Sequence, residues 1–224
     1  MAKKDFDAYA KNYNAILSEQ LNFFEEDNLY FAEYKIAKLK NLLSFQPKHI
    51  LDFGCGIGRS TLFLTQYFPE AQTYGCDISQ ASLAEAEKTV PSAHFFLTPA
   101  LSEKPKTFDV IFVSNVFHHI KLSERAKTLD LITQSSTTGG SIVVFEHNPY
   151  NPVTRHLVNT CPFDQDAVLL KPKELKTLFK KAGVQNITLE YTLFFPAFLK
   201  SFRFLEKYLH FLPLGGQYVV SGNL

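Results

Sequence analysis

Short apolar runs alternate along the chain with longer segments in which apolar residues recur at helical spacing. The short runs predict strands within residues 49–53, 73–78, 93–98, 108–120, 141–145, 185–195 and 217–221. The longer segments predict two helices within residues 5–44, one that begins near residue 60, and others over 80–88, 123–133 and 171–182. Strands that alternate with helices in this way are typical of an α/β protein.

The run at residues 108–120 predicts a strand that is buried on both faces, as the strands of parallel sheets are. Its end carries Asn115, His118 and His119. The next predicted strand ends in a similar way, in Glu146 and His147. Because doubly wound sheets bind ligands beyond the carboxyl ends of their strands, we expect a reactive face at these positions.

The segment from His49 to Ser60 reads as a strand, a tight turn and the start of a helix, with glycine at positions 54, 56 and 58 of the turn. Glycine has no Cβ, so the turn can adopt positive φ and let a ligand lie against the backbone, facing the first amides of the next helix. A nucleotide-like cofactor is the expected ligand.

Spacing distinguishes between cofactors. Dinucleotide-binding turns have the pattern G-x-G-x-x-G. This turn has G-x-G-x-G, and Asp52 stands two residues before the first glycine. A carboxylate at that position repels a pyrophosphate and suits a cationic ligand with an ammonium group. The next predicted strand ends in Asp77, which can accept hydrogen bonds from both hydroxyls of a ribose.

These two segments resemble the first two motifs of the class I methyltransferases that depend on S-adenosylmethionine (SAM), and residues 108–120 resemble the fourth. The resemblance implies an α/β, Rossmann-like fold with a seven-stranded, mostly parallel sheet, an antiparallel last strand, helices on both faces and an N-terminal helical lid. It also implies SAM as the cofactor. The residues expected to bind it are Asp52, Gly54, Cys55, Gly56, Gly58, Asp77, Ile78, Asn115 and Tyr13.

The resemblance divides the chain into a helical lid over residues 1–45 and a SAM-binding core over residues 46–224. Tyr9 and Tyr13 are candidates to close the lid, and Tyr13 is the candidate to contact the SAM carboxylate. The alternative is that both tyrosines face the core from an amphipathic helix. In the second helix the apolar stripe is predicted to consist of Tyr30, Tyr34, Ala37 and Leu42.

Methyl transfer from a sulfonium is an in-line displacement in which alignment of the nucleophile matters most. A hydroxyl acceptor also needs a general base, and a histidine with a pKa of about 6.5 can serve at neutral pH. We predict His147 as this base, with His118 as the second candidate and Glu146 to orient the imidazole or bind substrate. Each histidine could instead be a loop side chain that bonds only backbone. His118, His119, Glu146, His147 and Asp164 could converge on a metal ion, but they lack a known ligand spacing, so we predict no metal.

Three further segments, residues 146–152, 161–170 and 212–218, resemble a bacterial methyltransferase subgroup encoded beside polysaccharide and glycolipid biosynthesis enzymes. The resemblance implies a small-molecule acceptor, such as a sugar or a lipid-linked intermediate. The acceptor atom stays open.

Residues 196–212 predict a helical insert rich in aromatic residues. One side is predicted to carry Phe198, Leu199, Phe202, Leu205 and Leu209, and the other Lys200, Arg203 and Lys207. A basic amphipathic helix of this kind can lie at a membrane surface or hold a lipid tail. The commoner arrangement is a helix packed against the core or against a second subunit, which would make a homodimer.

Composition narrows the remaining choices. A chain of 224 residues with 46% hydrophobic residues can bury a full core, and a net charge of +1 gives no support to a nucleic-acid partner. The first residues have no apolar segment typical of a signal peptide, and no uncharged run approaches the ~20 residues of a membrane span. Three cysteines without C-x-x-C spacing indicate reduced thiols in a cytoplasmic protein.

Three other functions stay open. An NAD-dependent oxidoreductase keeps the fold, but the glycine spacing and Asp52 disfavour it. A SAM-binding regulatory domain without catalysis is disfavoured by the polar residues at both strand ends. Methylation of nucleic acid is disfavoured because Asn148, Pro149 and Tyr150 follow the fifth predicted strand and not the fourth.

Overall fold

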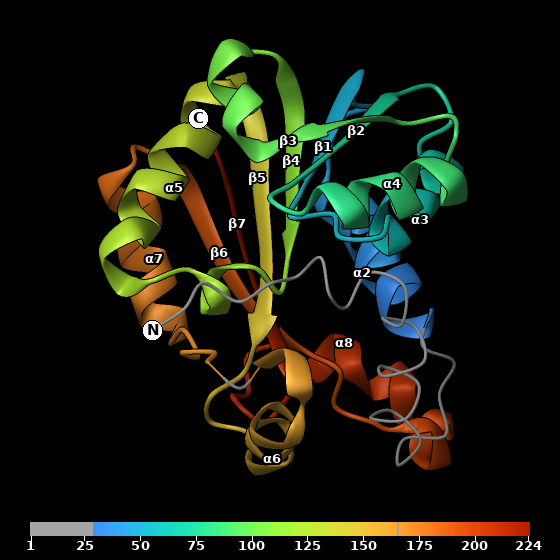
Figure 1. Cartoon of the computed structure of the whole chain (residues 1–224). Coiled ribbons are helices and arrows are strands. Elements are labelled where there is room, and N and C mark those ends of the chain that lie inside the picture. Colours follow the sequence, from blue (N-terminus) through green and yellow to red (C-terminus); the bar gives the residue numbers. More distant parts are fainter. Residues whose placement is uncertain (1–28, 165) are drawn as a thin grey trace.

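Seven strands form one sheet in the order β3-β2-β1-β4-β5-β7-β6 in the computed structural model, which describes residues 29–164 and 166–224. The strands are β1 (His49–Phe53), β2 (Gln72–Asp77), β3 (His94–Leu97), β4 (Phe108–Ser114), β5 (Ser136–His147), β6 (Gln185–Thr192) and β7 (Gln217–Asn223). The pairs from β3 to β5 are parallel, and β7 is antiparallel to both β5 and β6. The predicted sheet, mostly parallel with an antiparallel last strand, is confirmed (Figure 1).

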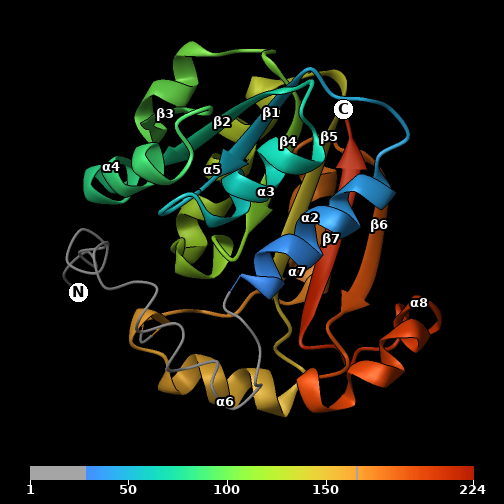
Figure 2. The ribbon, with the colours of Figure 1, turned by 90° about the vertical axis from the view of Figure 1, so that its right-hand side faces the viewer.

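Helices cover both faces of the sheet (Figures 1 and 2). On one face lie α2 (Tyr30–Leu42), α3 (Arg59–Tyr67) and α4 (Gln80–Thr89), and on the other lie α5 (Leu122–Ser135) and α7 (Pro172–Lys181). The core is divided accordingly, because Val110 and Phe112 of β4 belong to one buried cluster and Ile111 and Val113 to the other. The prediction that this strand is buried on both faces is therefore confirmed.

Helix α2 buries a different face from the predicted one. The buried residues are Ala32, Lys35, Ile36 and Leu39, whereas Tyr30, Tyr34, Ala37 and Leu42 are only partly buried. The predicted stripe is wrong because Lys35 finds a polar partner below the helix, where its Nζ donates to Ser114 Oγ, while the Tyr34 hydroxyl donates to Glu206 at the side of the buried face. Residues 1–28 lie outside the described residues, so Tyr9, Tyr13 and the lid remain predictions.

Two strand boundaries also differ from the predicted ones. Strand β4 ends at Ser114 because Asn115 has a positive φ of 57°, and a short 3-10 turn, Phe117–His119, follows. Strand β5 begins at Ser136 and not at Ser141. The longer start of β5 is held by the end of the chain, since Leu224 N donates to Gly140 O at 3.1 Å.

Three further helical segments lie beyond the carboxyl end of β5 (Figure 1). They include α6 (Pro152–Thr160), the 3-10 segment Ala197–Leu205 and α8 (Glu206–Leu209). The predicted helical insert at residues 196–212 is thus present as a 3-10 helix followed by a short α-helix. Within residues 29–164 and 166–224, no helix has both the length and the apolar character needed to cross a membrane.

Candidate functional site

The turn after β1 has the backbone conformation that its glycines allow. Gly54 and Gly56 have φ values of 74° and 54°, a region that favours glycine. A Cβ on Gly54 would stand only 2.4 Å from Cγ2 of Val116, in the segment after β4. The turn therefore packs directly against the end of the neighbouring strand.

Asp77, at the end of β2, reaches across to the same turn. Its Oδ2 accepts a hydrogen bond from Gly56 N at 2.9 Å, and its Oδ1 accepts one from Ser79 N at 2.9 Å. Both carboxylate oxygens are thereby fixed at the turn. Ile78, the next residue, is exposed beside it.

Asp52, at the end of β1, is buried under the turn. Thr61 Oγ1 donates to its Oδ2 at 2.7 Å and fastens the first part of α3 to the strand. Burial raises the pKa of Asp52 to about 7, although the Thr61 hydrogen bond opposes the shift. Asp52, Gly54, Gly56, Gly58 and Asp77 together form what we call the glycine-loop site.

The residues present fit SAM. A Cβ built on Gly56 meets no atom within 4 Å, so the backbone at this point borders open space. Asn115 Oδ1 is buried and has no hydrogen-bond partner within the described part of the chain. Leaving such an oxygen unsatisfied costs about 1–3 kcal/mol, and a donor such as an ammonium group would remove that cost.

Cys55 supports the turn itself. Its N–H donates to Cys76 O at 3.0 Å, and its carbonyl accepts from Gly58 N at 3.0 Å. Burial raises the pKa of the Cys55 thiol well above its usual range. The side chain and both polar backbone groups are therefore engaged in the fold, which leaves its predicted contact with the cofactor without a polar group.

A second group of polar residues gathers at the ends of β4 and β5. We call it the histidine cluster, and it consists of His118, His119, Glu146, His147 and Asp164. His118 Nδ1 lies 2.6 Å from Glu146 Oε2, and its Nε2 lies 3.4 Å from Asp164 Oδ1. The ring centroids of His118 and His147 are 5.1 Å apart, and those of His118 and His119 are 4.1 Å apart.

Glu146 anchors this cluster to the backbone. Its Oε1 accepts hydrogen bonds from Val116 N at 3.0 Å and from Phe117 N at 2.7 Å, while its Oε2 holds His118. The buried Arg125 of α5 fixes the same segment from another side, because its Nε donates to Phe117 O at 3.1 Å. The cluster is rigidly placed next to the glycine turn, since Val116 also contacts Gly54.

Charge is divided unequally among the three histidines. Burial lowers the pKa of His118, but Glu146 and Asp164 outweigh it and raise this pKa to about 9. Burial and the positive His118 lower the pKa of His119 to about 3 and that of His147 to about 4. At neutral pH His118 is an imidazolium between two carboxylates, and His147 is a neutral imidazole that can accept a proton.

Lys35 is a site residue that the sequence analysis did not identify. Its Nζ donates to Ser114 Oγ at 2.8 Å, at the end of β4. Burial and the charge of Arg59 lower its pKa to about 7, while Glu146 and Asp52 oppose the shift. Lys35 is thus attracted by one acid of the glycine-loop site, Asp52, and by one acid of the histidine cluster, Glu146. The sequence indicated this role of Lys35 only by placing a lysine inside the helical pattern of residues 30–42.

The cluster also has the geometry of a cation site. Donor atoms of His118, His147 and Asp164 lie within 4.8 Å of one another. A protonated His118 already places a positive charge between the carboxylates of Glu146 and Asp164, so the cluster does not require a metal. The absence of a metal therefore stays a prediction.

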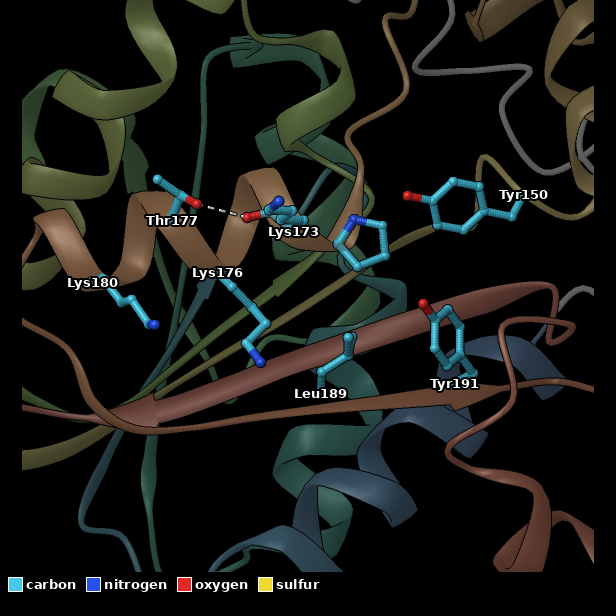
Figure 3. A pocket seen from close by; sticks show the side chains of 8 residues that line it. Tyr150, Lys173, Lys176, Thr177, Lys180, Leu189 and Tyr191 are labelled. Carbon is cyan, nitrogen blue, oxygen red and sulfur yellow. Dashed lines mark hydrogen bonds between the residues drawn. The ribbon is translucent and has the colours of Figure 1, made fainter.

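A surface pocket lies apart from both groups, between α7 and β6 (Figure 3). Its volume is about 380 Å³, and its lining includes Lys173, Lys176, Lys180, Tyr150 and Tyr191. Strand β6 is the sheet edge opposite β3, so the pocket is separated from the glycine-loop site by several strands. It contains none of the predicted site residues.

Comparison with known proteins bears directly on the glycine-loop site. Residues 50–140, which span β1 to the first part of β5, match the family model described as a methyltransferase domain. In sequence, this part of the chain is therefore similar to methyltransferase domains. The match favours SAM over the NAD-dependent alternative, and it includes every predicted cofactor residue of the glycine-loop site as well as Ile78 and Asn115.

Relatives of the methyltransferase domain include trans-aconitate 2-methyltransferases. The protein of that name from Rhodopseudomonas palustris is 27% identical over 170 residues, which cover 75% of this chain and 64% of the relative. The one from Methylobacterium nodulans is 31% identical over 121 residues, which cover 52% of this chain and 46% of the relative. The chain thus spans less than two thirds of the length of these relatives.

Solved structures show the same fold. A SAM-dependent methyltransferase from Archaeoglobus fulgidus superimposes with a TM-score of 0.69 at 15% identity, covering 88% of this chain and 94% of that one. A possible histamine N-methyltransferase from Thermotoga maritima gives a TM-score of 0.68 at 18% identity, with 97% of each chain covered. The Rossmann-like fold predicted from the sequence is confirmed.

Proposed function

We propose that this protein transfers the methyl group of SAM to an oxygen of a small-molecule acceptor. The observation that carries the proposal is the adjacency of the glycine-loop site and the histidine cluster. Gly54 packs against Val116, and Val116 N donates to Glu146, so a cofactor site and a proton-accepting site meet at the ends of β1, β4 and β5. An in-line displacement needs this arrangement of methyl donor and nucleophile.

The amino-acid end of SAM is a zwitterion, so its site needs an acid, a cation and a neutral acceptor. Asp52 supplies the negative field, Asn115 Oδ1 accepts from the ammonium, and Lys35 pairs with the carboxylate. Asp77, which Gly56 N and Ser79 N fix at the turn, holds the ribose hydroxyls. Tyr13, outside the described residues, remains a second candidate for the carboxylate. When bound, SAM supplies an electrophilic methyl group.

The proton of a hydroxyl acceptor goes to His147. His118 is the poorer base, because Glu146 and Asp164 already engage both of its ring nitrogens. The lowered pKa of His147 keeps its imidazole neutral at pH 7. Glu146 is a positioning residue that holds His118 and the backbone after β4, and through them the acceptor side of the site.

A neutral base beside the methyl donor favours a hydroxyl acceptor, and we propose a sugar or a lipid-linked intermediate. The relatives are named for trans-aconitate, a carboxylic acid. A carboxylate is already deprotonated at pH 7, so it needs no base. The second candidate function is therefore methyl ester formation on a small carboxylic acid, and loss of His147 would leave that reaction largely unaffected.

The test uses SAM with a labelled methyl group. The full chain is incubated with separate lipid and water-soluble extracts of the source organism and, in parallel, with trans-aconitate, and the labelled products are treated with mild base. A base-labile label indicates a methyl ester, whereas a label that resists base is assigned to oxygen, nitrogen or carbon by mass spectrometry, and the proposal expects a methyl ether. No enzyme-dependent label in any fraction would contradict the proposed activity.

A further inference from the structure

Residues 198–214 expose their aromatic side chains, while Arg203 and Glu206 turn toward the body of the protein. Six of the thirteen exposed large hydrophobic residues in the described part of the chain fall in this stretch. They are Phe198, Phe202, Phe204, Tyr208, Phe211 and Leu214, each between 49% and 66% exposed, and we call them the aromatic ridge.

Two charged residues of the stretch, Arg203 and Glu206, contact α2 and the preceding loop. Glu206 accepts hydrogen bonds from Tyr34 OH at 2.8 Å and from Phe194 N at 3.0 Å. The Arg203 guanidinium lies 4.3 Å from the ring centroid of Tyr30, and its Nε donates to Phe195 O at 3.3 Å. The predicted grouping is therefore wrong for Arg203, which turns inward, and for Phe198 and Phe202, which are exposed. Polar partners on α2 and in the preceding loop hold Arg203 and Glu206 inward.

The exposed side chains of the stretch therefore include aromatic rings and positive charge but no acid. Glu206 is the one acid in residues 194–216, and its carboxylate is turned toward α2. Lys200 and Lys207 remain exposed among the rings of the aromatic ridge. Aromatic residues interspersed with lysines are the composition of segments that lie in the headgroup region of an anionic bilayer.

We propose that the aromatic ridge attaches this protein to the surface of an anionic membrane. A second copy of the chain is a poorer occupant, because two-fold pairing of one ridge with another would bring Lys200 and Lys207 close to the same lysines of the partner. The helical segments Ala197–Leu205 and α8 lie beyond the carboxyl end of β5, the strand that ends in His147 (Figures 1 and 2). Attachment at this end brings a membrane-borne acceptor toward the site.

Membrane attachment is inferred from the aromatic ridge and does not depend on methyl transfer. Only the identity of the acceptor rests on the proposed function. A lipid-linked hydroxyl compound would be presented to His147 from the membrane side. SAM binding takes place at the glycine loop, so it is measured separately from vesicle binding. Failure of one measurement thus leaves the other interpretable.

The experiment is co-sedimentation of the full chain with vesicles of phosphatidylcholine, alone or mixed with phosphatidylglycerol. We expect binding to the mixed vesicles that weakens as salt is added, and little binding to the neutral ones. The double variant Lys200→Gln, Lys207→Gln should bind about 25-fold more weakly, since each lysine near an anionic surface is worth roughly a factor of five. The double variant Phe204→Ser, Phe211→Ser should lose about tenfold per ring.

Matched controls separate the ridge from general surface effects. Leu122→Ser removes an equally exposed apolar side chain from α5, and Lys173→Gln with Lys180→Gln removes two lysines from α7. These controls should bind vesicles like the unaltered chain, and all variants should keep its thermal unfolding and SAM affinity. Equal binding to neutral and mixed vesicles, or ridge variants that bind normally, would overturn the proposal. So would a dimer in sedimentation velocity that becomes a monomer in the phenylalanine variant, because the ridge would then contact a second copy.

Discussion

Lys35 is a buried cation whose replacement should stabilise the fold while weakening cofactor binding. The pKa of Lys35 falls from 10.5 to about 7 in the folded protein. Because one pKa unit corresponds to about 1.4 kcal/mol, the charged form of Lys35 opposes folding by roughly 5 kcal/mol below pH 7. Lys35→Met removes this cost. It also leaves the Ser114 hydroxyl without its partner, which lowers the free energy of unfolding by about 1–2 kcal/mol. We expect a net gain of about 3 kcal/mol in the free energy of unfolding.

The pH dependence of that gain follows from the direction of the shift. Between about pH 7 and 10.5 the folded chain has released the Lys35 proton, while the unfolded chain still holds it. The unfolded state therefore binds more protons in this window, and the stability contributed by Lys35 rises as the pH rises. Lys35→Met should lack this rise, so the two proteins should approach one another in stability toward pH 10.

Urea unfolding at several pH values measures the stability, and calorimetry measures SAM binding. The variant should bind SAM about 10- to 100-fold more weakly, as expected when a charged hydrogen bond to the ligand is lost. Lys40→Met, an exposed position on the same helix, is the control and should change the stability by less than about 0.5 kcal/mol. A Lys35→Met variant that is less stable than the unaltered chain, with the same slope against pH and unchanged SAM affinity, would refute the reasoning.

Three further predictions concern the histidine cluster. His147→Gln should lower turnover of a hydroxyl acceptor by about 10²- to 10⁴-fold and leave the SAM dissociation constant unchanged, and full turnover would assign the base elsewhere. Glu146→Gln should lower the free energy of unfolding by about 3–5 kcal/mol in urea titrations, because it leaves the His118 imidazolium short of a buried partner; unchanged stability would contradict a charged pair. Exhaustive dialysis against a chelator should leave turnover unchanged, whereas a loss that an added divalent metal restores would show that the cluster is a metal site.

The strands and the glycine turn were predictable because their determinants are local. A strand buried on both faces must be apolar almost throughout, as β4 is from Val110 to Val113. The turn after β1 needs positive φ at Gly54 and Gly56, and this requirement is visible in the sequence as alternating glycines. These features do not depend on how distant parts of the chain meet.

The orientation of α2 and of the aromatic ridge was not predictable for the opposite reason. Lys35 is buried because Ser114, 79 residues away, offers a hydrogen-bond acceptor. Glu206 points inward because Tyr34, 172 residues away, donates to it. Apolar periodicity cannot indicate such pairs, since it assigns charged side chains to the outside.

The candidate site was predictable in its members but not in their protonation. His118, Glu146 and His147 were placed at strand ends from the sequence, where the structure brings them together. Only the structure places Asp164 against His118 and gives the latter two carboxylate neighbours, and these raise its pKa to about 9. The sequence could not show that His118 is charged and His147 neutral, because their pKa values depend on neighbours that are distant in the chain.

Calorimetric titration with SAM tests the central claim most directly, with the unaltered chain compared with Asp77→Ala and with Asp130→Ala as an exposed control. We predict saturable binding to the unaltered chain and to the control, and a loss of at least about tenfold in Asp77→Ala, because the ribose hydroxyls lose their charged acceptor. Circular dichroism should show the same fold in all three proteins. Equal SAM affinity for Asp77→Ala and the unaltered chain, or no SAM binding to the folded unaltered chain, would contradict the assignment of the glycine-loop site.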